Sequence, residues 1–254
     1  MSVYEHKPAV AVFHEAHEAG IAAAKLIAEL LRAKPNAVLG LATGSTPIGL
    51  YAELVRMHRE DGLDFSRATF FNLDEYVGLP REHVASFHRF MREHLFDHIN
   101  AMPDRTFIPN GMAADLQAEC RRYEALLREY GPVDLQILGI GVNGHIGFNE
   151  PGADLNGDTN IVTLADKTRK DNARFFDNLD AVPTSALTMG IASILRARRI
   201  LLLAFGEAKR EAICKLMSAS VSPACPATAL RGHDNVALLL DAQAASALDA
   251  PACP

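Results

Sequence analysis

The stretch 138–152 is the segment of this chain whose residue types are best suited to chemistry. It is rich in glycine and places His145 between Asn143 and Glu150. A histidine held by a carboxylate gains and loses a proton near neutral pH, so this arrangement is typical of acid/base catalysis. The alternative is a structural histidine that only hydrogen-bonds the backbone.

The same stretch contains a literal GxGxxG pattern after an apolar run, and in a dinucleotide-binding protein that pattern opens a helix. Here Gly147, Asn149 and Pro151 oppose a helix. The pattern also lies in the middle of the chain, without a clear acidic residue at the end of a strand at the required distance. We therefore predict a loop whose glycines let the backbone approach a ligand, and no NAD site.

A pair of acids, Asp74 and Glu75, follows the apolar run 68–73. Open α/β sheets bind ligands beyond the carboxyl ends of their strands, which is where this pair would lie. A carboxylate there can act as a general base if it is partly shielded from water. Taken alone, the pair is better explained as solvated loop acids or as a helix cap.

A glycine-containing turn between a strand and a helix is a candidate anion site. It comprises Thr43, Gly44, Ser45 and Thr46, and Pro47 follows as the expected first helical residue with Thr46 as the N-cap. Free backbone N–H groups and the positive end of the helix dipole attract anions, although a well-capped helix without a ligand gives the same pattern. The turn is not a Walker A loop, because the GK[ST] ending is absent.

Two cations are further candidates for binding an anion. Lys209 is expected in the first turn of a helix, where a positive charge opposes the helix dipole unless an anion lies nearby. Arg174 lies in the segment NARFF. Each of them, taken alone, is most simply a surface cation.

Motifs for metals and for nucleophilic catalysis are absent. The sequence lacks GxSxG and HExxH, and His94 and His98 have helical i, i+4 spacing but no third ligand. The cysteines lack CxxC spacing, so we expect reduced thiols in a reducing compartment and no metal site. These cysteines are Cys120, Cys214, Cys225 and Cys253.

The elements that must position these residues follow an alternating pattern. Apolar, strand-like runs alternate with helical patterns, which predicts an open, mostly parallel α/β sheet with helices on both faces. The expected strands are 9–13, 38–42, 68–73, 133–140, 160–164, 199–205 and 235–241. The expected helices are 18–33, 47–60, 86–99, 115–130, 167–176, 185–196 and 207–218. Nothing marks a domain boundary, so we expect a single catalytic domain, 1–254, with a mobile tail at 243–254.

The composition of the chain excludes some classes of binding partner. The 254-residue chain has a net charge of -6 and 49% hydrophobic residues. We find no basic stripe, so nucleic acid is not an expected partner. No apolar run is long enough to span a bilayer, and the first seven residues lack the layout of a signal peptide. We therefore expect a cytoplasmic protein that does not contact membranes.

Read together, these segments resemble the glucosamine-6-phosphate deaminase family. The matching pieces, in the family's order, are LATGSTPIGLY, FNLDEYVGL, SFHRFMREHLFDHI, LGIGVNGHIGFNEPG, TRKDNARFFD, ALTMGIASIL and FGEAKREAI. The combination of FNLDEYVGL with GHIGFNEP is highly specific. The resemblance implies a modified Rossmann-like fold related to ribose-5-phosphate isomerase and 6-phosphogluconolactonase, a small sugar-phosphate substrate, and no metal or organic cofactor.

The resemblance also implies that glucosamine 6-phosphate and water become fructose 6-phosphate and ammonia. Asp74 then corresponds to the base that moves a proton between C2 and C1 of the open-chain sugar. His145 corresponds to the acid/base that opens the ring, oriented by Asn143 and Glu150. The phosphate clamp corresponds to Thr43, Gly44, Ser45, Thr46, Arg174 and Lys209.

Two departures from the family pattern matter. Many members have Asp where this chain has Asn143, which cannot supply charge to raise the pKa of His145, so we expect Glu150 to carry more of that role. Hexameric members bind an N-acetylated sugar phosphate through basic and small polar residues just after the histidine motif. The segment 153–162 contains no Lys or Arg, so we expect no activation by N-acetylglucosamine 6-phosphate. The sequence is compatible with a monomer and with a homo-oligomer.

Two alternative functions would use part of the same set of residues. A 6-phosphogluconolactonase-like hydrolase would also use a phosphate clamp and a histidine, but it does not need the FNLDEYVGL segment. A sugar-phosphate-sensing regulatory domain would carry a DNA-binding helix-turn-helix, and none precedes Ala9. The presence of Asp74, His145 and Glu150 together favours catalysis.

Overall fold

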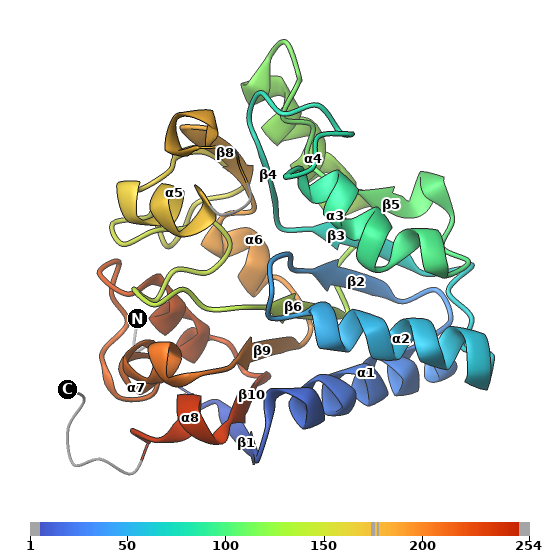
Figure 1. The fold of residues 1–254 in the computed structure, drawn as a ribbon, viewed down its shortest axis with the longest axis horizontal. Helices are drawn as coiled ribbons and strands as arrows, with labels where there is room; N and C mark the ends of the chain where they lie inside the picture. The colour runs from blue at the N-terminus through green and yellow to red at the C-terminus, as the bar shows by residue number, and fades with distance from the viewer. Residues whose placement is uncertain (1–5, 174–175, 177, 249–254) are drawn as a thin grey trace.

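The main sheet has seven parallel strands in the order β1-β10-β9-β6-β2-β3-β5 (Figure 1). This computed structural model describes residues 6–173, 176 and 178–248. The expected open, mostly parallel α/β sheet is confirmed. The strands are β1 (Ala9–Phe13), β2 (Val38–Leu41), β3 (Thr69–Asn72), β5 (Thr106–Phe107), β6 (Leu135–Leu138), β9 (Ile200–Ala204) and β10 (Val236–Asp241).

Helices cover both faces of this sheet, as predicted. Steps from β1 to β2, β3 and β5 all run in one direction along the sheet, whereas the later steps run back the other way. Because parallel crossovers are right-handed, the helices of the outward and return steps lie on opposite faces. The outward helices are α1 (Ala16–Ala33), α2 (Ile48–Asp61) and α3 (Phe87–His94). The return helices are α4 (Leu116–Tyr130), α6 (Ile191–Leu195) and α7 (Arg210–Ser218).

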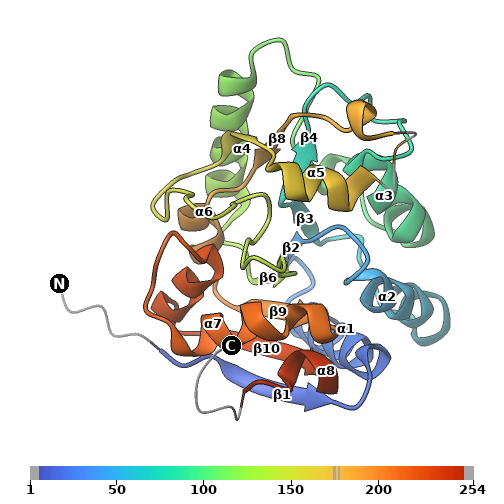
Figure 2. The same ribbon diagram turned by 60° about the vertical axis from the view of Figure 1, so that its left-hand side comes forward.

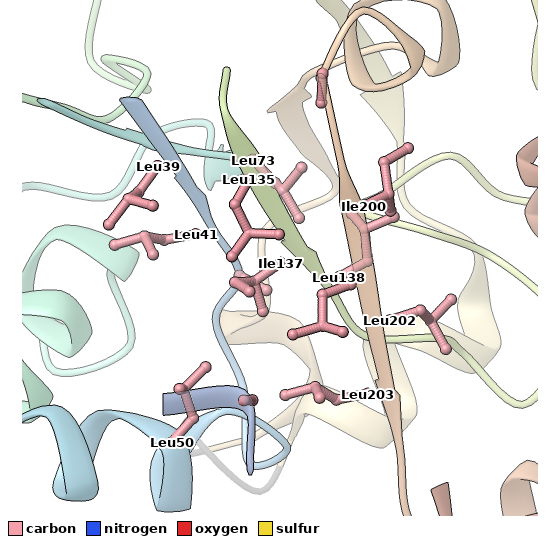
Figure 3. Close-up of a cluster of buried hydrophobic side chains, with 14 of the residues drawn as sticks. Leu39, Leu41, Leu50, Leu73, Leu135, Ile137, Leu138, Ile200, Leu202 and Leu203 are labelled. Carbon is pink, nitrogen blue, oxygen red and sulfur yellow. The ribbon is translucent and has the colours of Figure 1, made fainter. Parts of the chain in front are cut away.

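Leucine and isoleucine side chains from the central strands form the core (Figure 3). Leu39 of β2, Ile137 of β6 and Leu202 of β9 are fully buried, and Leu50 of α2 packs against the same cluster. Each such side chain stabilises the fold by roughly 1.5–3 kcal/mol through burial of apolar surface. Strands buried on both faces read as near-continuous apolar runs, which is why the sequence predicted them correctly.

A second, smaller sheet is antiparallel and was not predicted. It comprises β4 (Asp74–Tyr76), β8 (Ser185–Thr188) and β7 (Asn160–Thr163), in the order β4-β8-β7, and lies to one side of the main sheet (Figure 2). The prediction of one helix over 185–196 is wrong. Gly190 separates β8 from α6, because its backbone lies against the carbonyl groups of Gly157 and Asp158.

Several predicted boundaries shift by a few residues. Helix α2 begins at Ile48 with Pro47 in the cap position and no side-chain cap bond, so Thr46 is not its N-cap. The predicted helix 86–99 divides into α3 and a 3-10 turn, Phe96–His98. Helix α5 is Asp166–Asn172, and α8 is Ala242–Ala245 within the expected tail, of which 249–254 lie outside the described residues.

The structure also tests the predicted state of the cysteines and the predicted absence of a membrane-spanning helix. Cys120 and Cys225 are free and buried, but Cys214 is disulfide-bonded, so the expectation of four reduced thiols is wrong for this residue. Sequence spacing did not reveal that pairing, because the fold and not a local motif brings sulfur atoms together. No helix within the described ranges has the length and apolar character needed to cross a membrane.

The close approach at Gly190 gives a stability prediction. A Cβ at this position would lie 2.1 Å from the carbonyl oxygen of Gly157, and a backbone atom cannot easily move away. Gly190→Ala should lower the free energy of unfolding by about 2 kcal/mol or more, measured by urea denaturation. The control is Gly49→Ala in α2, where a Cβ meets nothing within 4 Å and should stabilise the helix by roughly 0.5–1 kcal/mol. Equal stabilities of the two variants would contradict the packing assignment.

Candidate active site

Four loops that follow four parallel strands meet at the carboxyl edge of the main sheet. The turn 43–46 follows β2, Asp74 follows β3, His145 follows β6, and Lys209 follows β9. All four line one cavity of about 470 Å³. Because parallel strands end at the same edge, segments more than 150 residues apart in the sequence lie together here.

Asp74 provides a carboxylate at the wall of this cavity. It is the first residue of β4, and its side chain is 5% exposed. Burial, together with the neighbouring charge of Glu75, raises its pKa from 3.8 to about 8. A carboxylate with a raised pKa accepts a proton more readily than an ordinary aspartate, which suits a general base near neutral pH.

His145 is held in a hydrogen-bonded chain with Asn143 and Glu150. The Asn143 Oδ1 atom lies 2.8 Å from His145 Nδ1, and the Asn143 Nδ2 atom donates to Glu150 Oε2 at 2.7 Å. Because the ionised carboxylate only accepts hydrogen bonds, the amide nitrogen of Asn143 must face Glu150 and its oxygen must face the histidine. Nδ1 of His145 therefore carries a hydrogen, and Nε2 is the nitrogen that can accept a proton at the cavity.

Glu150 is the charged member of this chain. Its burial opposes ionisation, but the hydrogen bond and charge of His145, with hydrogen bonds from Thr168 and Asn143, lower its pKa to about 2. The Glu150 Oε2 atom also lies 3.5 Å from His145 Nδ1. Glu150 is thus a fixed negative charge beside the histidine across the physiological pH range.

A backbone connection joins the Asp74 side of the cavity to the His145 loop. Asp74 pairs with Thr188 in the β4–β8 ladder, and the Thr188 hydroxyl accepts a hydrogen bond from the Phe148 backbone N–H at 3.1 Å. The Asn149 side chain donates to the Met189 carbonyl at 2.8 Å. Gly147, with φ at +55°, would carry a Cβ 2.9 Å from the Thr188 hydroxyl and 3.5 Å from an Asp74 carboxylate oxygen. A side chain at position 147 would therefore push the His145 loop away from Thr188 and Asp74.

The same cavity carries groups suited to an anion. Gly44 has φ at +90° and opens the turn so that residues 43–46 line the cavity before α2 begins. Lys209, half-buried at the end of the 3-10 turn Glu207–Lys209, lines the same cavity. The backbone N–H groups of a turn before a helix and a lysine on the same cavity are groups that can bind phosphate. Arg174 lies outside the described residues, so its assignment stays a prediction.

Aromatic side chains and one hydroxyl complete the cavity wall, and sequence reasoning did not identify them. Tyr76, Phe87 and Phe148 pack against one another, with ring centroids 4.9 to 5.9 Å apart. Thr168, at 6% exposure, donates to Glu150 Oε1. The only sequence signal for Thr168 was its place in the TRKDN segment, since a lone threonine in a helix carries no functional pattern.

No group of three or more metal-ligating side chains occurs among the described residues. The cavity instead combines a buried carboxylate, a histidine with a fixed tautomer, and a lysine. This set can move protons within a small anionic molecule.

Comparison with known proteins places the chain in a family. Residues 14–238 match the family described as glucosamine-6-phosphate isomerases/6-phosphogluconolactonase. The chain is 51% identical over 224 residues to glucosamine-6-phosphate deaminase 1 of Bacillus subtilis (strain 168), covering 88% of this chain and 93% of that protein. It is 53% identical over 226 residues to the glucosamine-6-phosphate deaminase of Halothermothrix orenii, covering 89% of this chain and 94% of that protein.

Solved structures agree with the fold. A structure of a monomeric glucosamine-6-phosphate deaminase matches with a TM-score of 0.92 at 49% identity, covering 94% of this chain and 99% of that chain. The 6-phosphogluconolactonase of Trypanosoma brucei matches with a TM-score of 0.74 at 24% identity, covering 96% and 99%, which shows the fold alone. The chain therefore belongs to the family of glucosamine-6-phosphate isomerases and 6-phosphogluconolactonases.

Proposed function

We propose that the protein is a glucosamine-6-phosphate deaminase, which converts glucosamine 6-phosphate and water to fructose 6-phosphate and ammonia. The observation that carries this proposal is the joint placement of Asp74, His145, the turn 43–46 and Lys209 on one cavity. The deaminases at 51% and 53% identity support the same substrate. Because water is consumed, the net reaction is a hydrolysis coupled to an aldose–ketose isomerisation.

Ring opening is the first step, because C2 becomes acidic only beside a free C1 carbonyl. The sugar must lose the proton of its O1 hydroxyl and gain a proton at the ring oxygen. His145 Nε2 can accept the first proton and deliver the second. Asn143 holds the Nδ1–H tautomer, and Glu150 stabilises the imidazolium that forms between the two transfers.

Proton transfer between C2 and C1 follows. Asp74 takes the C2 proton, the C2–H electron pair forms a C1–C2 double bond, and the carbonyl oxygen gains the proton that the protonated amine at C2 releases, which frees the nitrogen lone pair. Asp74 then returns its proton to C1 while the nitrogen lone pair forms a C2–N double bond. Water adds to C2, ammonia leaves, and C2 becomes the ketone carbon of fructose 6-phosphate.

The phosphate group fixes the register of these atoms. Thr43, Gly44, Ser45, Thr46 and Lys209 hold it in this proposal, together with Arg174. Binding energy from this remote group keeps C1 and C2 at Asp74 during the reaction. The charged ester crosses a bilayer poorly, so we place the activity in the cytoplasm. A homo-oligomer is not required, because described residues of one chain line the cavity.

A 6-phosphogluconolactonase is the second candidate function, since this family includes that activity. Lactone hydrolysis needs a histidine and a phosphate site, but it needs no base over a C1–C2 bond. The buried Asp74, with its raised pKa, has no role in such a reaction. Solved lactonases at 24% identity or less support the fold only.

The central test is Asp74→Asn, with ammonia and fructose 6-phosphate measured together. Wild type should form both in equal amounts, and the variant should lose activity by about 10²-fold or more, because the amide cannot accept the C2 proton. No product from wild type would reject the function, and full activity of the variant would reject only the base.

The same variant provides its own folding control. An Asp74 pKa raised from 3.8 to about 8 means that the folded state holds its proton more tightly than the unfolded state. Wild type therefore loses stability as the pH rises through this range. Asp74→Asn lacks that loss and should be more stable than wild type at pH 8 to 9, by on the order of 2 kcal/mol, in chemical denaturation.

The charge of Glu150 gives a second prediction. Glu150→Gln should lower kcat/KM near neutral pH by about tenfold or more, because Asn143 is uncharged and the imidazolium of His145 loses its nearest negative charge. The matched control is Glu53→Gln. The pKa of Glu53 is also lowered, through its hydrogen bond to Arg56, but it does not line the cavity. Wild-type activity of Glu150→Gln would refute this role.

The segment after the histidine loop predicts the absence of one form of regulation. A separate cavity of about 530 Å³ is lined by Asp154, Asp158 and Glu150, and no Lys or Arg is among its lining residues. A sugar phosphate would meet negative charge there. Adding N-acetylglucosamine 6-phosphate should leave the substrate saturation curve of wild type unchanged, with an activatable deaminase as the positive control. A clear shift of the curve to lower substrate concentration would contradict this prediction.

A further inference from the structure

Glu75 is a buried acid beside the proposed base, and the chemistry above does not use it. It follows Asp74 on β4 and is 2% exposed. Successive side chains of a strand point to opposite faces, and Asp74 and Tyr76 line the cavity whereas Glu75 does not. A buried carboxylate is costly unless it is fully hydrogen-bonded, so its partners indicate its role.

The partners of Glu75 are backbone N–H groups, two of them from α3. Oε1 accepts from the Phe87 N–H at 3.0 Å and from the Tyr76 N–H at 2.9 Å, and Oε2 accepts from the His88 N–H at 3.0 Å. The next N–H of the helix, that of Arg89, donates to the Ser86 hydroxyl at 3.1 Å. Side chains therefore take the first three N–H groups of α3, and Glu75 takes two of them.

This contact joins the strand of the base to the wall of the cavity. Helix α3 and its cap contribute Ser86, Phe87, Phe90, Glu93 and His94 to the cavity lining. A negative charge at a helix N-terminus is also favoured by the helix dipole. A small change in the position of Glu75 would thus move this wall relative to Asp74.

The charge of Glu75 acts on Asp74 as well. Burial raises the pKa of Glu75, and its three backbone hydrogen bonds oppose that rise. Burial and the Glu75 charge both raise the pKa of Asp74. Tyr76 and Tyr123 lie near Asp74, and burial raises the pKa of each, so both are neutral. His145 and Lys209 face the same cavity.

His88, whose backbone N–H donates to Glu75, does not change its charge near neutral pH. Burial and the charge of Arg81 lower the pKa of His88 to about 4, against the opposing charge of Glu82, so His88 is neutral. Glu75 is therefore the nearby carboxylate whose removal changes the charge next to Asp74.

We propose that Glu75 is a positioning residue, whose buried carboxylate fixes the N-terminus of α3 to the strand that carries Asp74 and keeps a negative charge beside that base. The proposal rests on the deaminase function above. Glu75 touches no reacting atom in it and acts through Asp74 and α3.

The test compares Glu75→Gln with wild type in the deaminase assay across pH. The glutamine side chain carries no charge. Its NH2 group replaces one carboxylate oxygen, so a donor faces a backbone N–H where Glu75 has an acceptor. We expect kcat to fall by about tenfold or more, because α3 moves and Asp74 becomes a weaker base. Without the repelling charge Asp74 ionises more easily, so the acid limb of kcat/KM should move to lower pH by about one pH unit.

Asp115→Ala is the matched control, since Asp115 caps α4 by accepting from the Ala118 N–H at 2.9 Å and does not line the cavity. It should lower the free energy of unfolding by about 1 kcal/mol without moving the acid limb. If the acid limb of the kcat/KM profile stays at the wild-type pH in Glu75→Gln, Glu75 is only a structural cap and the proposal is overturned. A wild type that forms no fructose 6-phosphate would reject the deaminase function itself.

Glu75→Asp keeps the proposal testable if Glu75→Gln does not fold. The shorter side chain retains the charge but cannot reach both the Phe87 and His88 N–H groups. Its acid limb should stay at the wild-type pH while kcat falls. Wild-type kcat in Glu75→Asp would overturn the positioning role.

Discussion

The cost of burying carboxylates governs this site. Asp74 lines the cavity, Glu75 is buried next to it on β4, and Glu150 accepts a hydrogen bond from Thr168 of the cavity wall. An ionised carboxylate in such surroundings is unfavourable unless it is compensated. Glu75 is compensated by backbone N–H groups, and Glu150 by a histidine, an amide and a hydroxyl. Asp74 has no side-chain hydrogen bond within the described residues. In the proposed mechanism, one chemical group thus takes three roles, as a helix anchor, a fixed charge and a base, because its surroundings differ.

The parallel sheet brings these residues together, because its strands all end at the same edge. Each strand of the buried core delivers its following loop to one edge, and close packing of residues such as Leu39 and Ile137 fixes the strands. The small antiparallel sheet then adjusts the geometry. The Thr188 hydroxyl accepts a hydrogen bond from the His145 loop and Thr188 pairs with Asp74, so strand β8 holds both of the groups proposed to transfer protons.

Sequence patterns predicted the parts of this fold that depend on local periodicity. The buried parallel strands and the long helices α1, α2 and α4 were correct because their apolar residues recur with a regular period. Strand β4 was missed because its three residues include two acids, and its pairing depends on β8, more than 100 residues away. Glu75 was considered as a helix cap, but the sequence alone could not identify α3 as its helix. Arg174 lies outside the described residues and stays a prediction.

Asn143 shows how an uncharged amide can hold the histidine in place of a carboxylate. An aspartate at this position would accept the Nδ1 hydrogen of His145 and place a negative charge beside the ring. The amide keeps the first function, because Glu150 orients it so that its oxygen faces the ring. The second function passes to Glu150, whose carboxylate lies 3.5 Å from the same nitrogen and carries a pKa of about 2. The tautomer is therefore set by geometry and the charge by a neighbour, so the two requirements are met by different residues.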